Sequence, residues 1–355
     1  MGIYVIAAIF MFGILIAVHE FGHFITAKLS GVTVHEFSIG MGPLIWHKQG
    51  EETVYSLRLL PIGGFCAIEG EEGESNDPRS LSNQGFFRQF VIFAAGAAMN
   101  FLLGLVLVTV IYSGANAFYT AEIVDLNDAF PDQSESGVMV GDVIHAINGK
   151  RVYLMSDVNL LLSYGGIDKS QPLELTLLRD GEKISRTMER REYVDEDGST
   201  YMGYGFSYGG VEEVGFGGRL KYSWYTTVDF VRMVYFSLRM MVMGEVGVSD
   251  LSGPVGVVGS MAEVGQSSDS WLEALENIAY FAALISVNLS VMNLLPIPAL
   301  DGGKIFFLCL NTVGMKLFGK KVPARFENSL SAVFFIMLMG VMLLVTVSDI
   351  SKFFG

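Results

Sequence analysis

The pentapeptide His19-Glu20-Phe21-Gly22-His23 constrains what this chain can fold into more than any other feature. It follows an apolar stretch, residues 3–18, that contains no charged side chain. An HExxH pattern on a helix puts its two imidazoles one turn apart on one face, where they can share a metal ion beside a potential base. Ionisable groups at membrane depth cost roughly 2.5–3.5 kcal/mol each and are functional by default. A bound metal ion is the simplest partner that offsets this cost.

Composition predicts a polytopic α-helical membrane protein. Of the 355 residues, 51% are hydrophobic and 17% are charged, which is too apolar for an ordinary soluble domain. The net charge of −14 leaves no basic stripe to neutralise phosphates, so we expect no nucleic-acid partner. Cys66 and Cys309 lie in different segments without CxxC spacing, which predicts isolated thiols. The N-terminus lacks a basic start and a small-residue cleavage site, so we expect its apolar helix to be retained.

About four segments are long and apolar enough to cross a bilayer, which takes ~20 helical residues. They are residues 3–29, 90–112, 278–297 and 330–347. Lys and Arg recur in the first and third of the loops between these segments, so we expect those loops in the cytoplasm. Both termini and the long polar region between the second and third segments then face outward.

The loops add further predicted elements. Residues 34–40 and 53–59 predict short strands in a membrane-associated β-hairpin on the cytoplasmic side. An acidic patch follows them and is interpreted as a solvated loop: Glu69, Glu71, Glu72, Glu74 and Asp77. Residues 217–245 carry Trp224, Phe230, Val234, Leu238 and Met241 at helical spacing. They predict an amphipathic helix in the interface plane, with a fifth span as the alternative.

The outward polar region contains a domain-like pattern. It has strand-like runs at 121–124, 143–147 and 173–178, and residues 137–152 resemble the PDZ motif, with Ser136 replacing the usual Ala. A PDZ domain captures extended peptides at a strand edge, whereas the alternative is a folded spacer that binds nothing. The predicted domains are an N-terminal membrane half, a PDZ-like α+β domain, a linker with the interfacial helix and a C-terminal membrane half: residues 1–113, 114–192, 193–269 and 270–355.

Asp301 is the expected third metal ligand. It follows the third predicted span, at the depth expected for His19 near the cytoplasmic end of the first. Pro296 and Pro298 cannot both lie in a regular helix, so we expect that span to unwind where its backbone lines a polar cavity. His19, His23 and Asp301 would then hold one Zn²⁺ and leave a fourth position for water. Two His and one Asp favour zinc without fixing the metal.

Together, HEFGH at 19–23 and NLLPIPALDGG at 293–303 resemble the motifs of the site-2 protease family of intramembrane zinc metalloproteases. Four further stretches are similar to that family: FSIGMGP at 37–43, PIGGF at 61–65, AGAAMNF at 95–101 and SGPVG at 252–256. Ala97 stands where the family usually has Pro. The chain looks like the bacterial form with one PDZ domain, whereas some members, such as the regulator of sigma-E protease, carry two.

The resemblance implies that His19, His23 and Asp301 bind Zn²⁺ and that Glu20 is the catalytic acid and base. It implies a multi-pass endopeptidase of the bacterial cytoplasmic membrane, with its active site near the cytoplasmic side. The expected substrates are single-span membrane proteins, such as anti-sigma factors or remnant signal peptides. Another protease would trim their outer part first.

A substrate helix must unwind before hydrolysis, and a strand edge can pair with the freed backbone. We expect the hairpin at 40–43, with Gly40 and Gly42, to capture it. Asn293, Pro296 and Pro298 are expected to contact the extended substrate, although Asn293 can equally pack between spans.

Two other classes of function remain open at this point. One is a membrane adaptor whose PDZ-like domain acts while the metal site is vestigial. It predicts loss of a ligand or of Glu20, yet all four residues are present. The other is a metal transporter, because intramembrane His and Asp can also mark ion pathways. A transporter needs neither the Glu of HExxH nor an outward peptide-binding domain.

Overall fold

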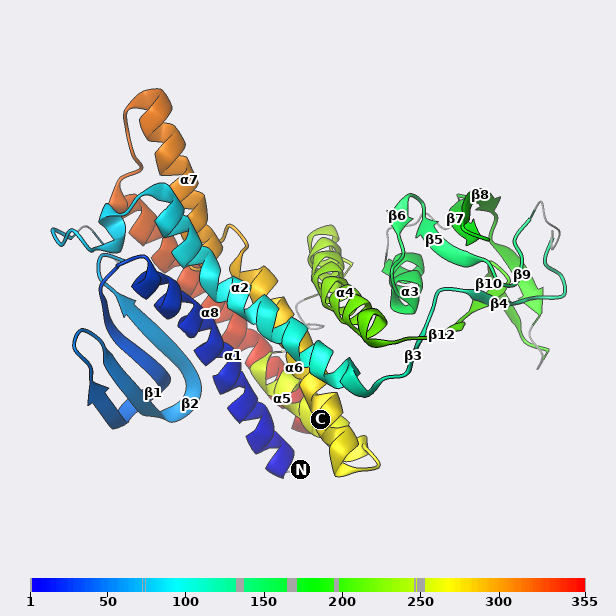
Figure 1. The fold of residues 1–355 in the computed structure, drawn as a ribbon, viewed down its shortest axis with the longest axis horizontal. Helices are drawn as coiled ribbons and strands as arrows, with labels where there is room; N and C mark the ends of the chain where they lie inside the picture. The colour runs from blue at the N-terminus through cyan, green and yellow to red at the C-terminus, as the bar shows by residue number, and fades with distance from the viewer. Residues whose placement is uncertain are drawn as a thin grey trace. The chain divides into compact units, whose positions relative to one another are not determined.

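The computed structural model describes residues 2–71, 73, 75–131, 137–164, 171–194, 198–245, 247 and 253–354 (Figure 1). Glu72 and Glu74 of the acidic patch, Ser136 of the PDZ-like motif and Ser252 of the SGPVG stretch lie outside these ranges. The chain divides into two compact units. The first unit comprises residues 1–108 and 246–355, and the second unit comprises residues 109–245.

Among the described residues, four helices are long and apolar enough to cross a membrane. They are α1 (Gly2–Leu29), α2 (Phe86–Ile111), α6 (Trp271–Asn293) and α8 (Ala324–Phe354). Each of the four predicted spans therefore coincides with a helix. The third prediction was wrong in its bounds, because α6 begins and ends earlier than residues 278–297. Its start is fixed by Ser270, whose hydroxyl accepts a hydrogen bond from the Glu273 amide as an N-cap.

The predicted interruption after the third span is confirmed. α6 ends at Asn293, and a turn containing Pro296 and Pro298 leads to α7 (Asp301–Phe318). Two glycines let the start of α7 fold against this turn. A Cβ on Gly302 would lie 2.2 Å from the Leu295 carbonyl oxygen, and one on Gly303 would lie 2.3 Å from that of Ile297. This close backbone packing fixes where α7 begins, and so where its first residue, Asp301, is placed.

A long antiparallel hairpin packs beside α1 (Figure 1). It consists of β1 (Val34–Gln49) and β2 (Val54–Ile68), so the predicted short strands are parts of longer ones. Over residues 36–39, β1 is flanked by β2 on both sides, since Phe37 pairs with both Cys66 and Tyr55. The predicted hairpin that contains residues 40–43 exists, but these residues do not form its turn. Those residues form a bend within β1, where Gly40 and Gly42 have φ of +83° and +81°, and the turn between the strands closes with the Gly50 amide on the Thr53 carbonyl.

Two apolar clusters hold the first unit together. One joins the end of α1 to the hairpin and α2: Ala27, Val32, Val34, Phe37, Cys66, Ile68, Leu81 and Ile92. The other joins Ala8 of α1, Met261 of α5 (Pro254–Ser267) and Ile278 of α6. The sequence analysis did not identify α5, which lies inside the predicted linker. Its first turn is satisfied by a residue far along the chain, because the buried Asp349 carboxylate of α8 accepts from the Gly253 and Gly256 amides at 2.9 and 2.8 Å.

The second unit has an antiparallel four-stranded sheet in the order β6-β5-β7-β8, and three strand pairs, β4–β11, β3–β12 and β9–β10. Its elements are β3 (Ala117–Tyr119), β4 (Ile123–Leu126), β5 (Val143–Ile147), β6 (Lys150–Arg151), α3 (Met155–Tyr164), β7 (Leu173–Arg179), β8 (Glu182–Met188), β9 (Arg191–Val194), β10 (Thr200–Gly203), β11 (Phe206–Tyr208), β12 (Val211–Glu213) and α4 (Phe216–Met243). Its core includes Ile144 of β5, Leu161 of α3, Leu175 of β7 and Phe236 of α4. The PDZ-like assignment and the predicted domain boundaries stay predictions.

The helix expected over residues 217–245 exists as α4, but its buried face differs from the predicted stripe. Phe230 and Val234 are buried, whereas Trp224 is 49% and Met241 46% exposed. α4 is not among the candidate spans found in the described chain, and its location at a membrane interface stays a prediction.

Removing the carboxylate that caps α5 should destabilise the first unit. In Asp349→Ala, two buried backbone N–H groups lose a charged acceptor, and we expect a loss of about 1.5–3 kcal/mol. Thermal unfolding of the purified full chain measures this, with Asp269→Ala at an exposed position as the control. An unchanged melting temperature in Asp349→Ala would show that the cap contributes nothing.

The second unit should lose stability as pH rises towards neutrality. Burial, followed by the neighbouring Asp157 charge, raises the pKa of Asp229 to about 7, while Ser156 donates to its carboxylate at 2.9 Å. The folded state therefore keeps a proton that the unfolded state releases between about pH 4 and 7, so stability falls across that window. We expect amide hydrogen exchange in α3 and α4 to accelerate from pH 5 to pH 8, after correction for intrinsic rates. Asp229→Asn should flatten this dependence, and an equal slope in both proteins would contradict the assignment.

Candidate metal centre

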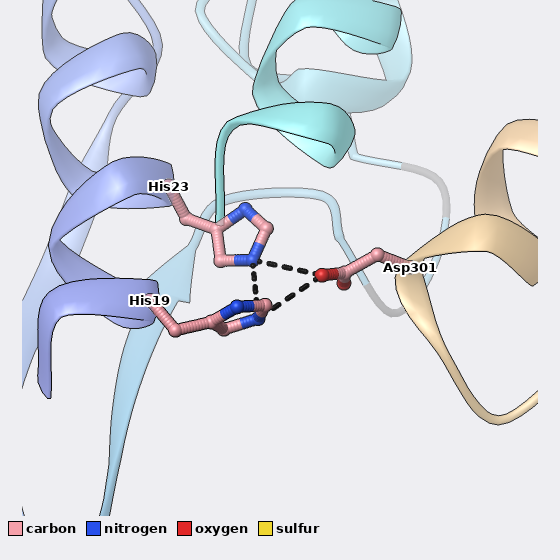
Figure 2. A group of neighbouring side chains, drawn as sticks. All are labelled: His19, His23 and Asp301. Atoms are coloured by element: carbon pink, nitrogen blue, oxygen red, sulfur yellow. Dashed lines mark hydrogen bonds and ion pairs between the residues drawn. The ribbon is translucent and has the colours of Figure 1, made fainter. Parts of the chain in front are cut away.

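His19 and His23 of α1 and Asp301 of α7 meet at one buried point (Figure 2). His19 Nε2 and His23 Nε2 lie 3.1 and 3.2 Å from Asp301 Oδ2, and 3.2 Å from each other. The three side chains come from opposite ends of the sequence, yet their ligand atoms form a nearly equilateral triangle.

This triangle has the dimensions of a zinc site. A tetrahedron with bonds of about 2.0 Å has edges of about 3.3 Å, close to the three separations observed. Among the described residues, the buried Asp301 Oδ2 has no hydrogen-bond partner that satisfies it. Two imidazole nitrogens and one carboxylate oxygen are a ligand set that zinc accepts, with the fourth position left open. The donor set and its geometry therefore fit the ion predicted from the sequence.

Polar groups next to the Nδ1 atoms of the two imidazoles can set the orientation of the rings. His23 Nδ1 lies 2.8 Å from the Ile92 carbonyl oxygen, so it donates there and leaves the Nε2 lone pair facing Asp301. His19 Nδ1 lies 3.5 Å from the side-chain amides of Asn100 and Asn293. Asn100 is 1% exposed, and its Oδ1 has no partner among the described residues. Because amide oxygen and nitrogen are interchangeable by rotation, Asn100 Oδ1 can accept from His19 Nδ1–H.

Gly96 allows α2 to approach the site. A Cβ at this position would lie 2.4 Å from His23 Nε2 and 2.6 Å from His19 Cε1. Gly22 of α1 is equally tight, since its Cβ would lie 2.4 Å from the Ala95 carbonyl oxygen. Gly96 and Asn100 were not predicted as site residues, although both belong to the AGAAMNF stretch that resembles the family. Their four-residue spacing, which puts both on one helix face, was the available signal.

Glu20 lies beside this triangle and is half-buried. Its Cγ would be 3.6 Å from a Cβ built on Gly64 of β2, and its carboxylate interacts electrostatically with His19, His23 and Asp301. The structure thus brings together the four residues predicted for the metal centre.

The predicted substrate residues are distributed around the centre. Asn293 is near His19, and Pro296 and Pro298 form the turn before Asp301. Gly40 lines an apolar cavity of about 440 Å³ between α1 and the hairpin, whereas Gly42 lies in the β1 bend and is not among the residues lining that cavity.

The sequence is matched by the family model described as peptidase family M50, over residues 7–341. This chain belongs to peptidase family M50, the site-2 protease family. The matched region contains the HExxH residues, Asn100 and Asp301, so it spans the whole candidate metal centre of this M50 peptidase.

Relatives extend the similarity over almost the entire chain. A Clostridium perfringens protein named "Putative zinc metalloprotease" is 35% identical over 351 residues, which cover 98% of both chains. "Zinc metalloprotease RasP" of Shouchella clausii and "Regulator of sigma-W protease RasP" of Bacillus subtilis are each 27% identical, with 99% of both chains covered. The predicted family and the predicted class of enzyme, a metalloendopeptidase, are confirmed, and the predicted cofactor, zinc, agrees with these names.

Asn100→Ala should weaken zinc binding by about 10- to 100-fold, because the amide that can fix His19 is lost. Competition with a chelator on the purified protein measures the zinc affinity. The control is Asn277→Ala, because Asn277 lies on α6 and donates a hydrogen bond to Ser268. A zinc affinity equal to that of the wild type would exclude Asn100 from orienting His19.

Proposed function

We propose that this M50 peptidase is a zinc-dependent endopeptidase that cleaves peptide bonds inside the transmembrane segments of single-span membrane proteins. The observation that carries the proposal is the buried triangle of His19, His23 and Asp301, built on an apolar helix and beside a broken one. The names of the relatives support zinc and proteolysis, and the Bacillus subtilis name supports a regulatory substrate.

The chemistry follows from the residues at the centre. Zinc bound by His19, His23 and Asp301 would supply a Lewis acid that activates water and polarises the scissile carbonyl. Glu20 takes a proton from the attacking water and delivers it to the leaving amine nitrogen. The Ile92 carbonyl holds the His23 ring in place during both steps.

The substrate must reach the site as extended chain. Gly40 and Gly42, at the bend of β1, have no partner in the described β1–β2 register, so a substrate backbone can pair there, and the neighbouring apolar cavity can accept an apolar side chain. We propose that Asn293, next to the turn formed by Pro296 and Pro298, hydrogen-bonds the substrate; its side chain lies 3.5 Å from His19 Nδ1, which supports this. We propose anti-sigma factors or remnant signal peptides, trimmed beforehand by another protease, as the substrates.

The proposed location is the bacterial cytoplasmic membrane. The distribution of Lys and Arg in the short loops supports an active site near the cytoplasmic side. Both termini and the PDZ-like domain, residues 114–192, would then be extracytoplasmic, where that domain can screen substrates by size or bind their new C-termini.

Glu20→Gln tests the mechanism. We expect the wild type to cleave a tagged, helix-breaking transmembrane substrate in detergent, and Glu20→Gln to be slower by about 10²–10⁴-fold, because the proton carrier is lost. Both proteins should hold about one zinc per chain, and Glu276→Gln, at an exposed position on α6, should behave as the wild type.

Equal cleavage by the wild type and Glu20→Gln would remove Glu20 from the mechanism. Absence of zinc from both would contradict the metal centre and return the adaptor hypothesis to the front. Zinc transport into proteoliposomes without proteolysis would favour the transporter instead.

A further inference from the structure

Asp301 uses one carboxylate oxygen toward the two imidazoles and has the other directed elsewhere. Oδ2 lies 3.1 and 3.2 Å from the His nitrogens, whereas Oδ1 is 4.0 Å from the Lys304 ammonium. Lys304 is three residues along α7 from Asp301, so both side chains lie on one face of that helix. Its ammonium is also 5.7 Å from the centre of the Phe93 ring of α2.

Lys304 is itself held by a residue from a different part of the first unit. Its Nζ lies 2.6 Å from Glu71 Oε1, in the loop that follows β2. The acidic patch was predicted to be a solvated loop, and for Glu71 this was wrong, since 23% of its side chain is exposed and it is paired. Exposed ion pairs stabilise little, but this one is partly buried next to a metal centre, where charges are weakly screened.

The loop that carries Glu71 is tied to the chain leaving α1. The Glu69 amide donates to the Thr33 carbonyl at 3.0 Å, and the Thr33 amide donates to the Arg79 carbonyl at 3.1 Å. The Glu71–Lys304 pair therefore links the helix that supplies two ligands to the helix that supplies the third.

The balance of charges around the metal centre also indicates a contribution from Lys304. Glu20, Asp301 and Glu71 all interact electrostatically with Lys304. With a divalent ion present, the ion and Lys304 together balance the three carboxylates. Removing Lys304 would leave a net negative charge in a region of low dielectric, and it would free Asp301 Oδ1 to rotate towards the ion.

We infer that Lys304 is a positioning residue for the metal centre. Glu71 holds the Lys304 ammonium near Asp301 Oδ1, and this keeps Asp301 Oδ2 facing His19 and His23. The inference rests on the metal centre of the proposed function. A polar or charged group that holds a metal ligand in place typically contributes 10- to 100-fold to metal affinity.

The test measures zinc affinity by chelator competition on the purified full chain. Lys304→Met, which keeps the side-chain length and removes the charge, should weaken binding about tenfold or more. Lys304→Arg keeps a cation within reach of Glu71 and should restore most of the affinity. Lys316→Met, an exposed lysine on the same helix, is the matched control and should bind as the wild type.

A double-mutant cycle separates positioning from a general loss of structure. Glu71→Gln should weaken binding less than Lys304→Met, and the two substitutions together should weaken it no further than Lys304→Met alone. The melting temperature of the metal-free protein reports the structural contribution of the Glu71–Lys304 pair separately, and the visible spectrum of bound Co²⁺ should change in Lys304→Met but not in Lys304→Arg. Wild-type zinc affinity in Lys304→Met, or a Lys304→Arg variant as weak as Lys304→Met, would overturn the inference.

The same proteins distinguish this inference from the proposed function. Wild-type protein that binds zinc but cleaves no transmembrane substrate would contradict the proposed endopeptidase, while the affinities would still report on Lys304. Wild-type protein that binds no zinc would overturn both.

Discussion

Two imidazoles and one carboxylate converge at one buried position in the first unit. The surrounding structure depends on holding these three polar groups together. His19, His23 and Asp301 are each at most 9% exposed, in a region built largely from apolar helices. Polar groups in such surroundings are costly unless they are paired or bind a metal. The separations of 3.1–3.2 Å between their ligand atoms are what a zinc ion requires.

The surrounding backbone is shaped to permit this convergence. Gly96 and Gly22 bring α1 and α2 together until the α2 backbone touches the imidazoles, and Gly302 folds the start of α7 onto the proline turn. Ile92 then fixes one ring through its carbonyl oxygen, and Asn100 is placed to fix the other. Small residues therefore act here by allowing close approach, while the polar groups around them set the orientation of the ligands.

Charged side chains around the candidate metal centre connect it to more distant parts of the first unit. Lys304 links Asp301 to Glu71, and Glu71 belongs to a loop that is hydrogen-bonded to the end of α1. The second unit contains its own buried acidic pair, Asp157 and Asp229, which α4 brings together beside Arg232. In both units, ionisable side chains join elements that are distant in sequence, so their partners could not be read from local spacing.

The sequence by itself determined the spans, the interruption at Pro296 and Pro298, and the residues of the candidate metal centre. These follow from hydropathy over about 20 residues, from the missing N–H of proline and from the one-turn spacing of HExxH. Only the tertiary structure decided the bend at Gly40, the helix α5 and the positions of Gly96, Asn100 and Lys304 beside the candidate metal centre. Each depends on backbone approach or on a partner far along the chain, as when Asp349 caps α5, and no local pattern encodes that proximity.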